Sequence, residues 1–497
     1  MKIFTKIALT LAVATTVATS AFAGGPMTNS NQSAHFLRSV ARGTSLTTDA
    51  VYTNPAGVVF MEDGFHLGLN DQMAAQTRTI TSTYAPFAMG VQNAGNPTKE
   101  FKGEVFSPAI PSVHFAWKHN RLALMAGMGV NGGGGSLEFA NGLGSFERQF
   151  SVLPVAVSQL GQPFGLSANQ YNMDMYLMGK SMTLAFNAGA AFRLTDWLSV
   201  AAQVRFSSTS NSYEGYMKNI SLNPNAPAFG MTGAMMPASQ FFQAIAAQFG
   251  QVNPQLAAAA AQYAALTADH ILDVKQKGTS ISPVVALAFH KGAWDASLKY
   301  EFKMATELEI ESAEVSAKDP VINGIFADGS KVKSETPALL AAAVSRHFGP
   351  VKVTAQWHHY FDKDAENSFS PVIEGNTNEY MMGVEWNITD KWLVSAGAQR
   401  TQLNMNENAY SDMNFSISSW SIAAGLKYQV CDLVGINLGI MPTIYDEVVA
   451  VGQASGVDFK DVYNRTSIAW GIGLDFKFGK YYLPQYCRVA FDRAARN

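Results

Sequence analysis

Apolar residues alternate strictly with small or polar residues in segments that recur from residue 64 to residue 478. The last segment is the clearest, because Trp470, Ile472 and Leu474 alternate there with Gly471 and Gly473. A two-residue period places the two sets on opposite faces of a β-sheet. The pattern predicts 14 strands, at about 64–78, 104–118, 121–131, 177–193, 197–213, 278–290, 294–311, 334–347, 351–363, 377–387, 391–405, 416–429, 434–447 and 463–478.

The connections between these strands alternate between long and short. Residues 79–103 and 214–277 form long connections, whereas 119–120 and 291–293 form tight turns. Long loops on one side, short turns on the other and an even strand number are typical of outer-membrane barrels. A soluble β-sandwich would also alternate, but with a one-sided apolar face and less regular loops. The predicted fold class is therefore all-β, a 14-stranded antiparallel transmembrane β-barrel over residues 61–478.

Aromatic residues lie near the predicted ends of several strands, at Trp117, Trp197, Trp294, Trp392, Tyr428 and Phe478. Aromatic rings form girdles at the water–lipid boundary of membrane barrels. Aromatic residues are also ordinary strand formers. Their recurrence beside the short turns favours the girdle.

The N-terminus has the pattern of a secretory signal peptide. Two lysines precede an apolar run at residues 7–18, and Ala21-Phe22-Ala23 forms an A-x-A cleavage site. A membrane anchor would need roughly 20 apolar residues, more than this run has. We therefore predict that residues 1–23 are removed and that the chain is exported to the outer membrane. No later segment has about 18 continuous apolar residues, which excludes helical spans.

Composition and motifs narrow the function classes. Charged residues make up only 15% of the chain, and the net charge of −3 comes without a basic stripe, so we expect no nucleic-acid partner. The sequence has no Gly-x-Ser-x-Gly, His-Glu-x-x-His or Cys-x-x-Cys motif. His358 and His359 are adjacent on a predicted strand, so they point to opposite faces. We expect no enzyme activity, no cofactor and no metal site.

Two segments do not follow the strand pattern. Residues 24–60 are rich in Ser, Thr and Asn and precede the first strand. Residues 238–267, inside the long connection 214–277, predict two short helices broken at 250–254. The first helix carries an apolar stripe at three- and four-residue spacing, formed by Phe241, Phe242, Ile245 and Phe249. The stripe either joins the two helices or leaves an exposed groove for a hydrophobic ligand.

Short motifs along the chain resemble one family. Arg42-Gly43, Asp49-Ala50 and Asn54-Pro55-Ala56-Gly57 resemble the N-terminal plug of the FadL-type long-chain fatty acid and hydrocarbon (toluene) transporters. Further matches follow at Pro111-Ser112-Val113-His114-Phe115, Phe192-Arg193-Leu194-Thr195-Asp196-Trp197, Thr336-Pro337-Ala338 and Gln356-Trp357. No single motif is specific, but their order is. The resemblance covers about residues 36–478.

The resemblance implies a mechanism as well as a fold. Residues 24–60, with Asn54, Pro55 and Ala56, would form a plug (hatch) inside the barrel on the periplasmic side. The groove at 241–249 would capture a ligand outside the cell and pass it to a site in the lumen. Movement of the plug would then open a route through the barrel.

The resemblance also implies a lateral exit through an inward kink in strand 3. That strand runs into Asn131, Gly132 and Gly133, and glycine tolerates such a kink. A flexible loop start is the alternative. The implied partners are a long-chain fatty acid or another hydrophobic ligand, outer-membrane lipid and the barrel assembly machinery, with the protein acting as a monomer in a Gram-negative outer membrane. A general diffusion porin or a structural or adhesive surface barrel is the alternative function.

The predicted lumen positions include sulfur-containing and basic side chains that could contact a ligand. Met125 and Met381 leave room for flexible apolar chains. Arg205, Lys299 and His358 could bind a carboxylate head group, or each could belong to a structural ion pair. The family directs basic residues at the carboxylate from positions that correspond to Thr209 and Thr377 here. That departure leaves neutral hydrocarbons open as substrates.

The two cysteines of the chain are Cys431 and Cys487. By the strand count, the turn that holds Cys431 and the C-terminal tail at 479–497 both lie on the periplasmic side. Neighbouring strands are about 5 Å apart, and the tail from Phe478 to Cys487 is long enough to reach. We therefore predict a Cys431–Cys487 disulfide.

Overall fold

The computed structural model describes residues 27–162, 165–316, 327–413 and 415–478. The predicted signal peptide at 1–23, the tail at 479–497 and Cys487 lie outside the described residues.

One antiparallel sheet curls into a closed barrel, because β1 pairs with β2 on one side and with β20 on the other. Three barrel strands are interrupted and count as β10 with β11, β12 with β13, and β18 with β19. The predicted fold class, a 14-stranded barrel, is confirmed. The strands are β1 (Gly64–Tyr84), β2 (Thr98–His119), β3 (Leu122–Phe139), β4 (Tyr171–Arg193), β5 (Leu198–Leu222), β9 (His270–Lys291), β10 (Trp294–Glu301), β11 (Glu307–Val315), β12 (Lys331–Lys333), β13 (Leu339–Phe348), β14 (Val351–Tyr360), β15 (Thr377–Asn387), β16 (Trp392–Gln402), β17 (Ser419–Cys431), β18 (Val434–Tyr445), β19 (Val448–Ala454) and β20 (Val457–Phe478).

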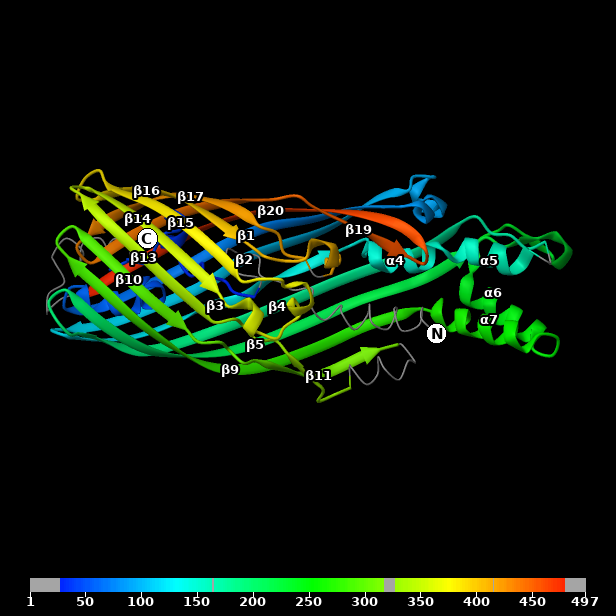
Figure 1. The fold of residues 1–497 in the computed structure, drawn as a ribbon, viewed down its shortest axis with the longest axis horizontal. Coiled ribbons are helices and arrows are strands. Elements are labelled where there is room, and N and C mark those ends of the chain that lie inside the picture. Colours follow the sequence, from blue (N-terminus) through cyan, green and yellow to red (C-terminus); the bar gives the residue numbers. More distant parts are fainter. Residues whose placement is uncertain (1–26, 163–164, 317–326, 414, 479–497) are drawn as a thin grey trace, which may run out of the picture.

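The barrel wall is taller on one side than on the other (Figure 1). Strand β5 has 25 residues and β4 has 23, whereas β13 and β14 have 10 each. The fifth strand, predicted to end at 213, continues to Leu222. The extension was missed because Glu214 and Lys218 interrupt the apolar residues of the outer face beyond residue 213, so the alternation is lost.

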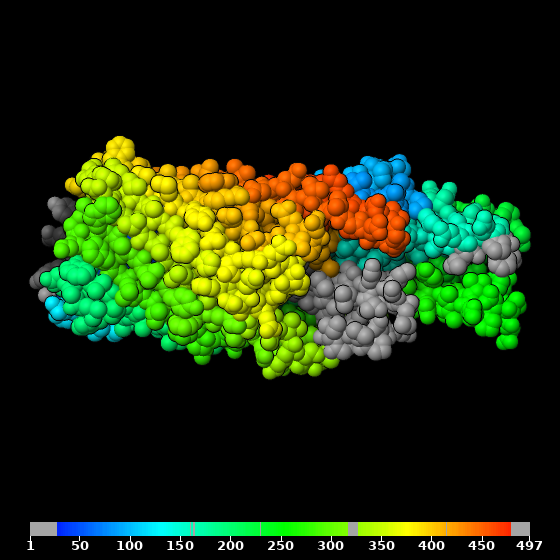
Figure 2. Space-filling view, in the orientation of Figure 1, coloured from blue at the N-terminus to red at the C-terminus, as the bar shows by residue number. Residues whose placement is uncertain are grey.

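The outer surface carries an apolar belt with an aromatic edge. Residues Val204, Ile281, Met382, Ile422 and Ile440 are among the exposed apolar side chains of this belt. Trp197, Trp294, Trp392 and Phe478 are also exposed and lie beside the short turns, as a girdle requires. Figure 2 shows that the molecule is elongated. No helix among the described residues is long and apolar enough to cross a membrane.

Residues 28–61, here called the inner segment, lie inside the barrel. The segment contains α2 (Ala34–Arg38), α3 (Ala50–Thr53) and the 3-10 helix η2 (Pro55–Phe60), and nearly all of its residues are buried. Helix α2 packs against β17, β18 and β20, and η2 packs against β4, β5 and β9. The segment therefore touches opposite sides of the barrel wall.

Four helices lie at the long-loop end, opposite the short-turn end (Figure 1). Helices α6 (Ala238–Phe249) and α7 (Pro254–Leu266) form the pair expected within 238–267. Helices α4 (Gly144–Ser151) and α5 (Leu153–Gly161) were not expected from the sequence. A continuous apolar cluster, here called the mouth cluster, fills this end and includes Tyr84, Phe87, Phe101, Phe139, Phe150, Tyr213, Phe241, Phe242, Phe415 and Tyr463.

Candidate functional site

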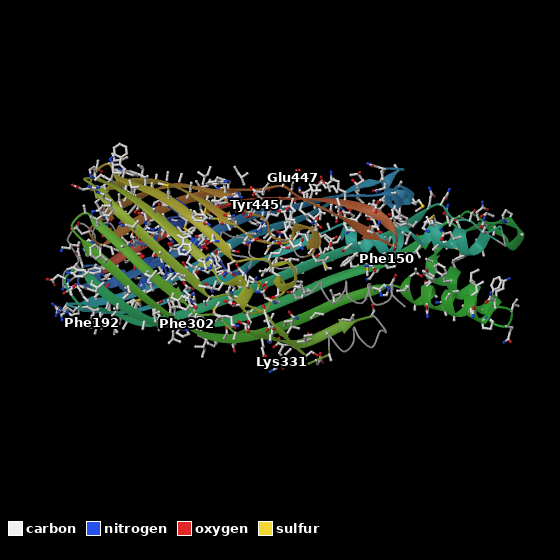
Figure 3. All side chains as sticks on the ribbon, viewed as in Figure 1. Phe150, Phe192, Phe302, Lys331, Tyr445 and Glu447 are labelled. Atoms are coloured by element: carbon white, nitrogen blue, oxygen red, sulfur yellow. The ribbon has the colours of Figure 1, made fainter. Side chains whose placement is uncertain are left out.

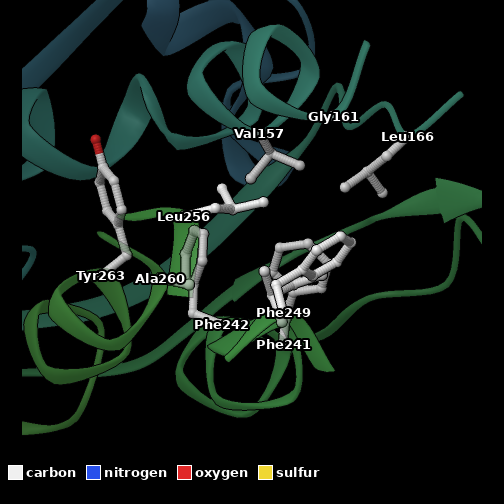
Figure 4. Close-up of a pocket in the computed structure, with 10 residues that line it drawn as sticks. Val157, Gly161, Leu166, Phe241, Phe242, Phe249, Leu256, Ala260 and Tyr263 are labelled. Atoms are coloured by element: carbon white, nitrogen blue, oxygen red, sulfur yellow. The ribbon is translucent and has the colours of Figure 1, made fainter. Parts of the chain in front are cut away.

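An apolar pocket lies between the helix pair and α5 (Figure 4). Its cavity is small, about 40 Å³. The side chains that line it carry no charge, and they include all four residues of the predicted stripe. The lining residues are Val157, Gly161, Leu166, Phe241, Phe242, Ile245, Phe249, Leu256, Ala260 and Tyr263.

The stripe both joins the helices and lines the pocket. The rings of Phe241 and Phe242 are 5.1 Å apart, and Phe242 stacks on Tyr263 at 5.1 Å. Both phenylalanines are buried, whereas Ile245 and Phe249 are half-buried. The two interpretations of the stripe therefore apply to different residues within it.

A sharp start of α7 sets the angle between the two helices. Asn253 caps the helix by accepting a hydrogen bond from the amide of Leu256 at 3.1 Å. Pro254 follows at the first helical position, where its missing N–H is no loss. The turn at 250–253 thus brings Tyr263 back over α6.

The predicted lumen cations Arg205 and Lys299 share one carboxylate. Arg205 forms an ion pair with Glu301, and Lys299 Nζ lies 2.6 Å from Glu301 Oε1. Lys299 also donates to the carbonyl oxygen of Tyr52 at 3.1 Å, and its ammonium lies 5.0 Å from the Tyr52 ring centre. These cations hold the inner segment to the wall. A ligand carboxylate would have to displace Glu301.

His358 is also occupied within the protein. Its Nδ1 lies 3.0 Å from Glu379 Oε2, which accepts a further hydrogen bond from Tyr360 at 2.9 Å. The other oxygen of Glu379 accepts hydrogen bonds from Gln399 and Thr401 at 2.6 and 2.9 Å. His358 therefore belongs to a satisfied polar network rather than to an open head-group site.

The remaining lumen candidates are separated from one another. Met125 packs in a small cluster with η2, whereas Met381 joins the mouth cluster's larger apolar core. Thr209 pairs with the hydroxyl of Thr183 at 2.9 Å, and Thr377 donates its amide to Asp362 at 2.7 Å. The lumen around the inner segment is polar, because buried charges from distant strands meet there.

Arg42 is the centre of the inner segment's attachment. Its guanidinium binds Asp49 at 2.8 Å and Glu385 at 2.8 Å. Arg38 binds the same Glu385 at 2.9 Å, and Ser45 donates to Asp49 at 2.6 Å. Two arginines and two carboxylates thus balance one another in a buried position. Glu385 was not among the predicted site residues, because it lies 343 residues from Arg42.

The plug motif folds against this charge cluster. Asn54 donates to the carbonyl oxygen of Ser45 at 3.0 Å, and Pro55 begins η2. The carbonyl oxygen of Ala56 accepts a hydrogen bond from Ser199 on β5 at 2.6 Å. These residues fix the shape of the inner segment and tie it to the wall.

The barrel wall is broken between β2 and β3. The strands pair at Val105 with Leu137 and again at Val113 with Met128, but not between these points. Register shifts in the pairing of β3 with β4 fall within 130–135. Gly133 has φ +66°, and a Cβ there would lie 2.3 Å from a backbone oxygen of Ser181. Only glycine fits that position.

The inner segment covers this break from within the barrel. Asn29 bonds to the backbone oxygens of Asn131 and Val130 at 2.9 and 3.0 Å. Gln32 also donates to Val130 at 2.7 Å, and Tyr52 donates to the side chain of Asn131 at 2.9 Å. Two backbone oxygens of the stretch that β2 leaves unpaired, those of Val130 and Asn131, therefore find partners on the inner segment. Gly132 lies beside them in the same irregular stretch.

Helix α4 is anchored across the mouth by two buried charges that the sequence did not single out. Arg148 binds both oxygens of Asp461 on β20, at 2.8 and 3.0 Å. Glu147 binds Lys99 on β2 at 2.7 Å and accepts from Tyr171 on β4 at 2.8 Å. Although burial opposes it, Asp412 and Asp461 raise the pKa of Arg148 above its usual value. Arg148 therefore keeps its positive charge at neutral pH.

Two further predictions concern metals and cysteines. Within the described ranges, no group of three or more His, Cys, Asp and Glu side chains could hold a metal ion. Cys431 ends β17 at the short-turn end. Because Cys487 lies outside the described residues, the Cys431–Cys487 disulfide stays a prediction.

Solved structures share this barrel fold. A Pseudomonas aeruginosa FadL homologue matches 93% of this chain and 100% of its own length, with a TM-score of 0.60 at 14% identity. The chain has the FadL-type barrel fold. The toluene transporter TodX of P. putida shows this FadL-type fold as well, with a TM-score of 0.53, 14% identity and coverage of 89% of this chain and 97% of that one. By sequence, no family model and no curated protein matches the chain.

Proposed function

We propose that this chain is an outer-membrane transporter that takes up hydrophobic small molecules. The observation that carries the proposal is the break between β2 and β3, which is covered from inside by the inner segment. Where the wall lacks this strand pairing, an apolar molecule would have a way into the lipid without crossing water. The FadL-type fold, shared with a toluene transporter, supports the same function.

The path begins at the long-loop end. An apolar molecule would be captured at the pocket lined by Phe242 and Phe249 and would pass into the mouth cluster. The inner segment, acting as a plug, would shift to uncover the lumen face of 129–136. The ligand would then leave sideways between β2 and β3. Burial of nearly all of the inner segment argues against a general diffusion porin, because such a porin keeps a water-filled lumen.

The buried charges bear on the choice of substrate within this class. Long-chain fatty acids need a cation for the carboxylate, and Arg205, Lys299 and His358 each contact a carboxylate of the protein. Neutral hydrocarbons need no such cation. The lumen therefore favours neutral hydrocarbons over fatty acids, and oleate remains the ligand that tests the fatty-acid prediction.

The test is a titration of the detergent-purified full chain with toluene, hexadecane, oleate and maltose. We expect saturable binding of the hydrocarbons and none of maltose. Phe242→Ser should weaken hydrocarbon binding about tenfold, because burying a polar group in an apolar pocket is unfavourable. Val252→Ser is the matched control, since Val252 is 80% exposed on the neighbouring turn.

Failure to bind either hydrocarbon or oleate would contradict the proposal. Steady ion conduction in a planar bilayer would favour the porin instead. Saturable binding of oleate alone would keep the transporter and return the fatty acid as its substrate.

A further inference from the structure

Two cations flank a tryptophan on the outer surface at the short-turn end. Trp294 pairs directly with Lys291 of β9 on one side and with Arg346 of β13 on the other. Residues directly opposite in an antiparallel pair share one face of the sheet. All three side chains are exposed on the outer face, at the edge of the apolar belt that lies nearest the short turns.

Aromatic rings hold both cations at this edge. The Arg346 guanidinium lies 5.1 Å from the ring centre of Trp294 and 4.8 Å from that of Phe348. The Lys291 ammonium lies 6.0 Å from the ring of Trp197. A cation over an aromatic face is attracted by the ring but keeps its net charge. The pair of positive charges thus persists at the lipid boundary.

Neither cation has a carboxylate partner among the residues that the structure describes. Arg400, on the outer face at the opposite edge of the belt, offers a contrast. It also lies over a tryptophan, Trp420, at 5.7 Å, but it forms an ion pair with Asp446 at 2.6 Å. Lys291 and Arg346 therefore have charge to offer to an outside group.

A furrow of about 560 Å³ crosses the apolar belt above these cations. It exists because Ala190 and Ala202, which pair across β4 and β5, are too small to fill the belt. Phe192, which is labelled in Figure 3 near the short-turn end, lines one side of the furrow. The furrow is lined by Leu122, Ala190, Ala191, Phe192, Val200, Ala201, Ala202, Val285, Ala286, Leu287, Leu298, Tyr300 and Leu340.

The furrow and the cations lie on the same faces of the same strands. On β9 the outer face runs from Val285 and Leu287 in the furrow to Lys291 at the edge. At about 3.3 Å per residue, Lys291 lies roughly 13 Å along the strand from Leu287. That separation suits one molecule with an apolar chain in the furrow and an anionic group at the edge.

We infer that this surface binds a glycerophospholipid, with an acyl chain in the furrow and its phosphate between Lys291 and Arg346. In outer-membrane barrels the short turns face the periplasm, so the lipid would come from the periplasmic leaflet. Lysine and arginine near a membrane surface attract anionic lipid head groups. The site lies outside the barrel and does not depend on the ligand that is transported.

The test uses the full chain, purified in mild detergent and titrated with dioleoyl phosphatidylglycerol under native mass spectrometry. We expect one retained lipid per chain. Replacing both cations, Lys291→Met with Arg346→Met, should weaken binding roughly 30-fold, given the usual contribution of each cation. Ala202→Phe should weaken it about tenfold by filling the furrow while leaving both charges in place. Arg400→Met is the matched control and should bind as the wild type does.

Dioleoylglycerol, which lacks the phosphate, should bind weakly to every variant. Unchanged retention in the double variant would overturn the proposal, and so would an equal loss in Arg400→Met. A wild type that retains no phosphatidylglycerol would overturn it too. Gel mobility before and after heating checks that each variant forms the barrel, and Ala202→Phe tests the site without touching the cations.

Discussion

The two halves of the lumen are held together by different forces. Around the inner segment, charged groups meet in fixed pairs, such as Arg42 with Asp49 and Glu385 at 2.8 Å. At the long-loop end, apart from the ion pairs that anchor α4, the mouth cluster is apolar and aromatic, and its contacts have no preferred direction. Paired charges specify one geometry, because a mismatched pair leaves an unbalanced charge in a buried place. Apolar packing accepts molecules of many shapes. The ion pairs therefore hold the inner segment in one position, whereas the mouth cluster can adapt to molecules of different shape.

The largest expected effect is at the centre of the polar half. Arg42→Met leaves Asp49 and Glu385 buried with one fewer cation between them. Breaking a buried ion pair in this way costs about 3–5 kcal/mol. We expect that loss in the free energy of unfolding, measured by urea titration in detergent with tryptophan fluorescence. Ion conduction in a planar bilayer should also rise as the inner segment loosens.

Lys102→Met is the control for Arg42→Met. Lys102 pairs with Glu104 on the outside of β2, and both side chains are exposed. Exposed pairs contribute only about 0–1 kcal/mol. Equal losses in the two variants would erase the distinction between the halves.

The next effect sharpens the comparison from the apolar side. Phe242→Ala removes a buried ring that stacks on Tyr263. A buried phenylalanine changed to alanine costs about 3 kcal/mol or more. We expect faster hydrogen exchange in α6 and α7, with Val252→Ala as the exposed control.

A hydrophobic ligand should restore part of the protection that Phe242→Ala loses, because it fills the void. No apolar ligand should restore Arg42→Met. Rescue of both variants, or of neither, would contradict the view that only the mouth adapts.

Asp362 gives a pH test in the loop between β14 and β15. Burial raises the pKa of Asp362 to about 6, against an ordinary value of 3.8. The folded loop therefore binds the proton more tightly than the unfolded chain does. The stabilisation from the Asp362 proton is fully present below about pH 4 and is lost as the pH rises to 6, a total of about 3 kcal/mol. Protection factors for the amides of 361–376, which correct for the intrinsic pH dependence of hydrogen exchange, should be larger at pH 5 than at pH 7.

Asp362→Asn should abolish that pH dependence, since the amide does not titrate. Thr377 donates its amide to the Asp362 side chain, and an asparagine oxygen can still accept that bond. Protection factors that are larger at pH 7 than at pH 5 would contradict the sign of the effect.

The smallest effect is expected outside both halves, at the predicted disulfide. Cys431→Ser should lower the free energy of unfolding, measured by urea titration, by less than about 1 kcal/mol, the low end for disulfides, because Cys487 follows the last strand. Mass spectrometry of the unreduced wild type should find no free thiol. The detection of two free thiols would contradict the predicted Cys431–Cys487 disulfide.

The barrel was predictable because lipid outside it forces a strict pattern on each strand. Trp470, Ile472 and Leu474 must face the belt, and Gly471 and Gly473 must leave room for the inner segment. Above the belt, water touches the outer face and the pattern fades. For that reason the sequence pattern did not predict the extension of β5 to Leu222.

The site was predictable only in part. The stripe at 241–249 and the glycines at 132–133 followed from local spacing and backbone freedom. The partners of Arg42 and Arg148 did not, since Glu385 and Asp461 lie more than 300 residues away in the chain. Pairing between distant buried charges leaves no local pattern in a sequence.

The unequal height of the wall has a consequence for reach. A membrane-spanning strand needs about 9–11 residues, and β5 has 25. At about 3.3 Å per residue and a tilt near 40°, the surplus carries its tip roughly 35 Å past the lipid. In an outer membrane the tall side of the mouth would thus lie well beyond the lipid, in hydrated surroundings in which apolar molecules dissolve poorly. The tall side of the wall would let apolar molecules pass these hydrated surroundings inside the barrel, so that they need not dissolve in water.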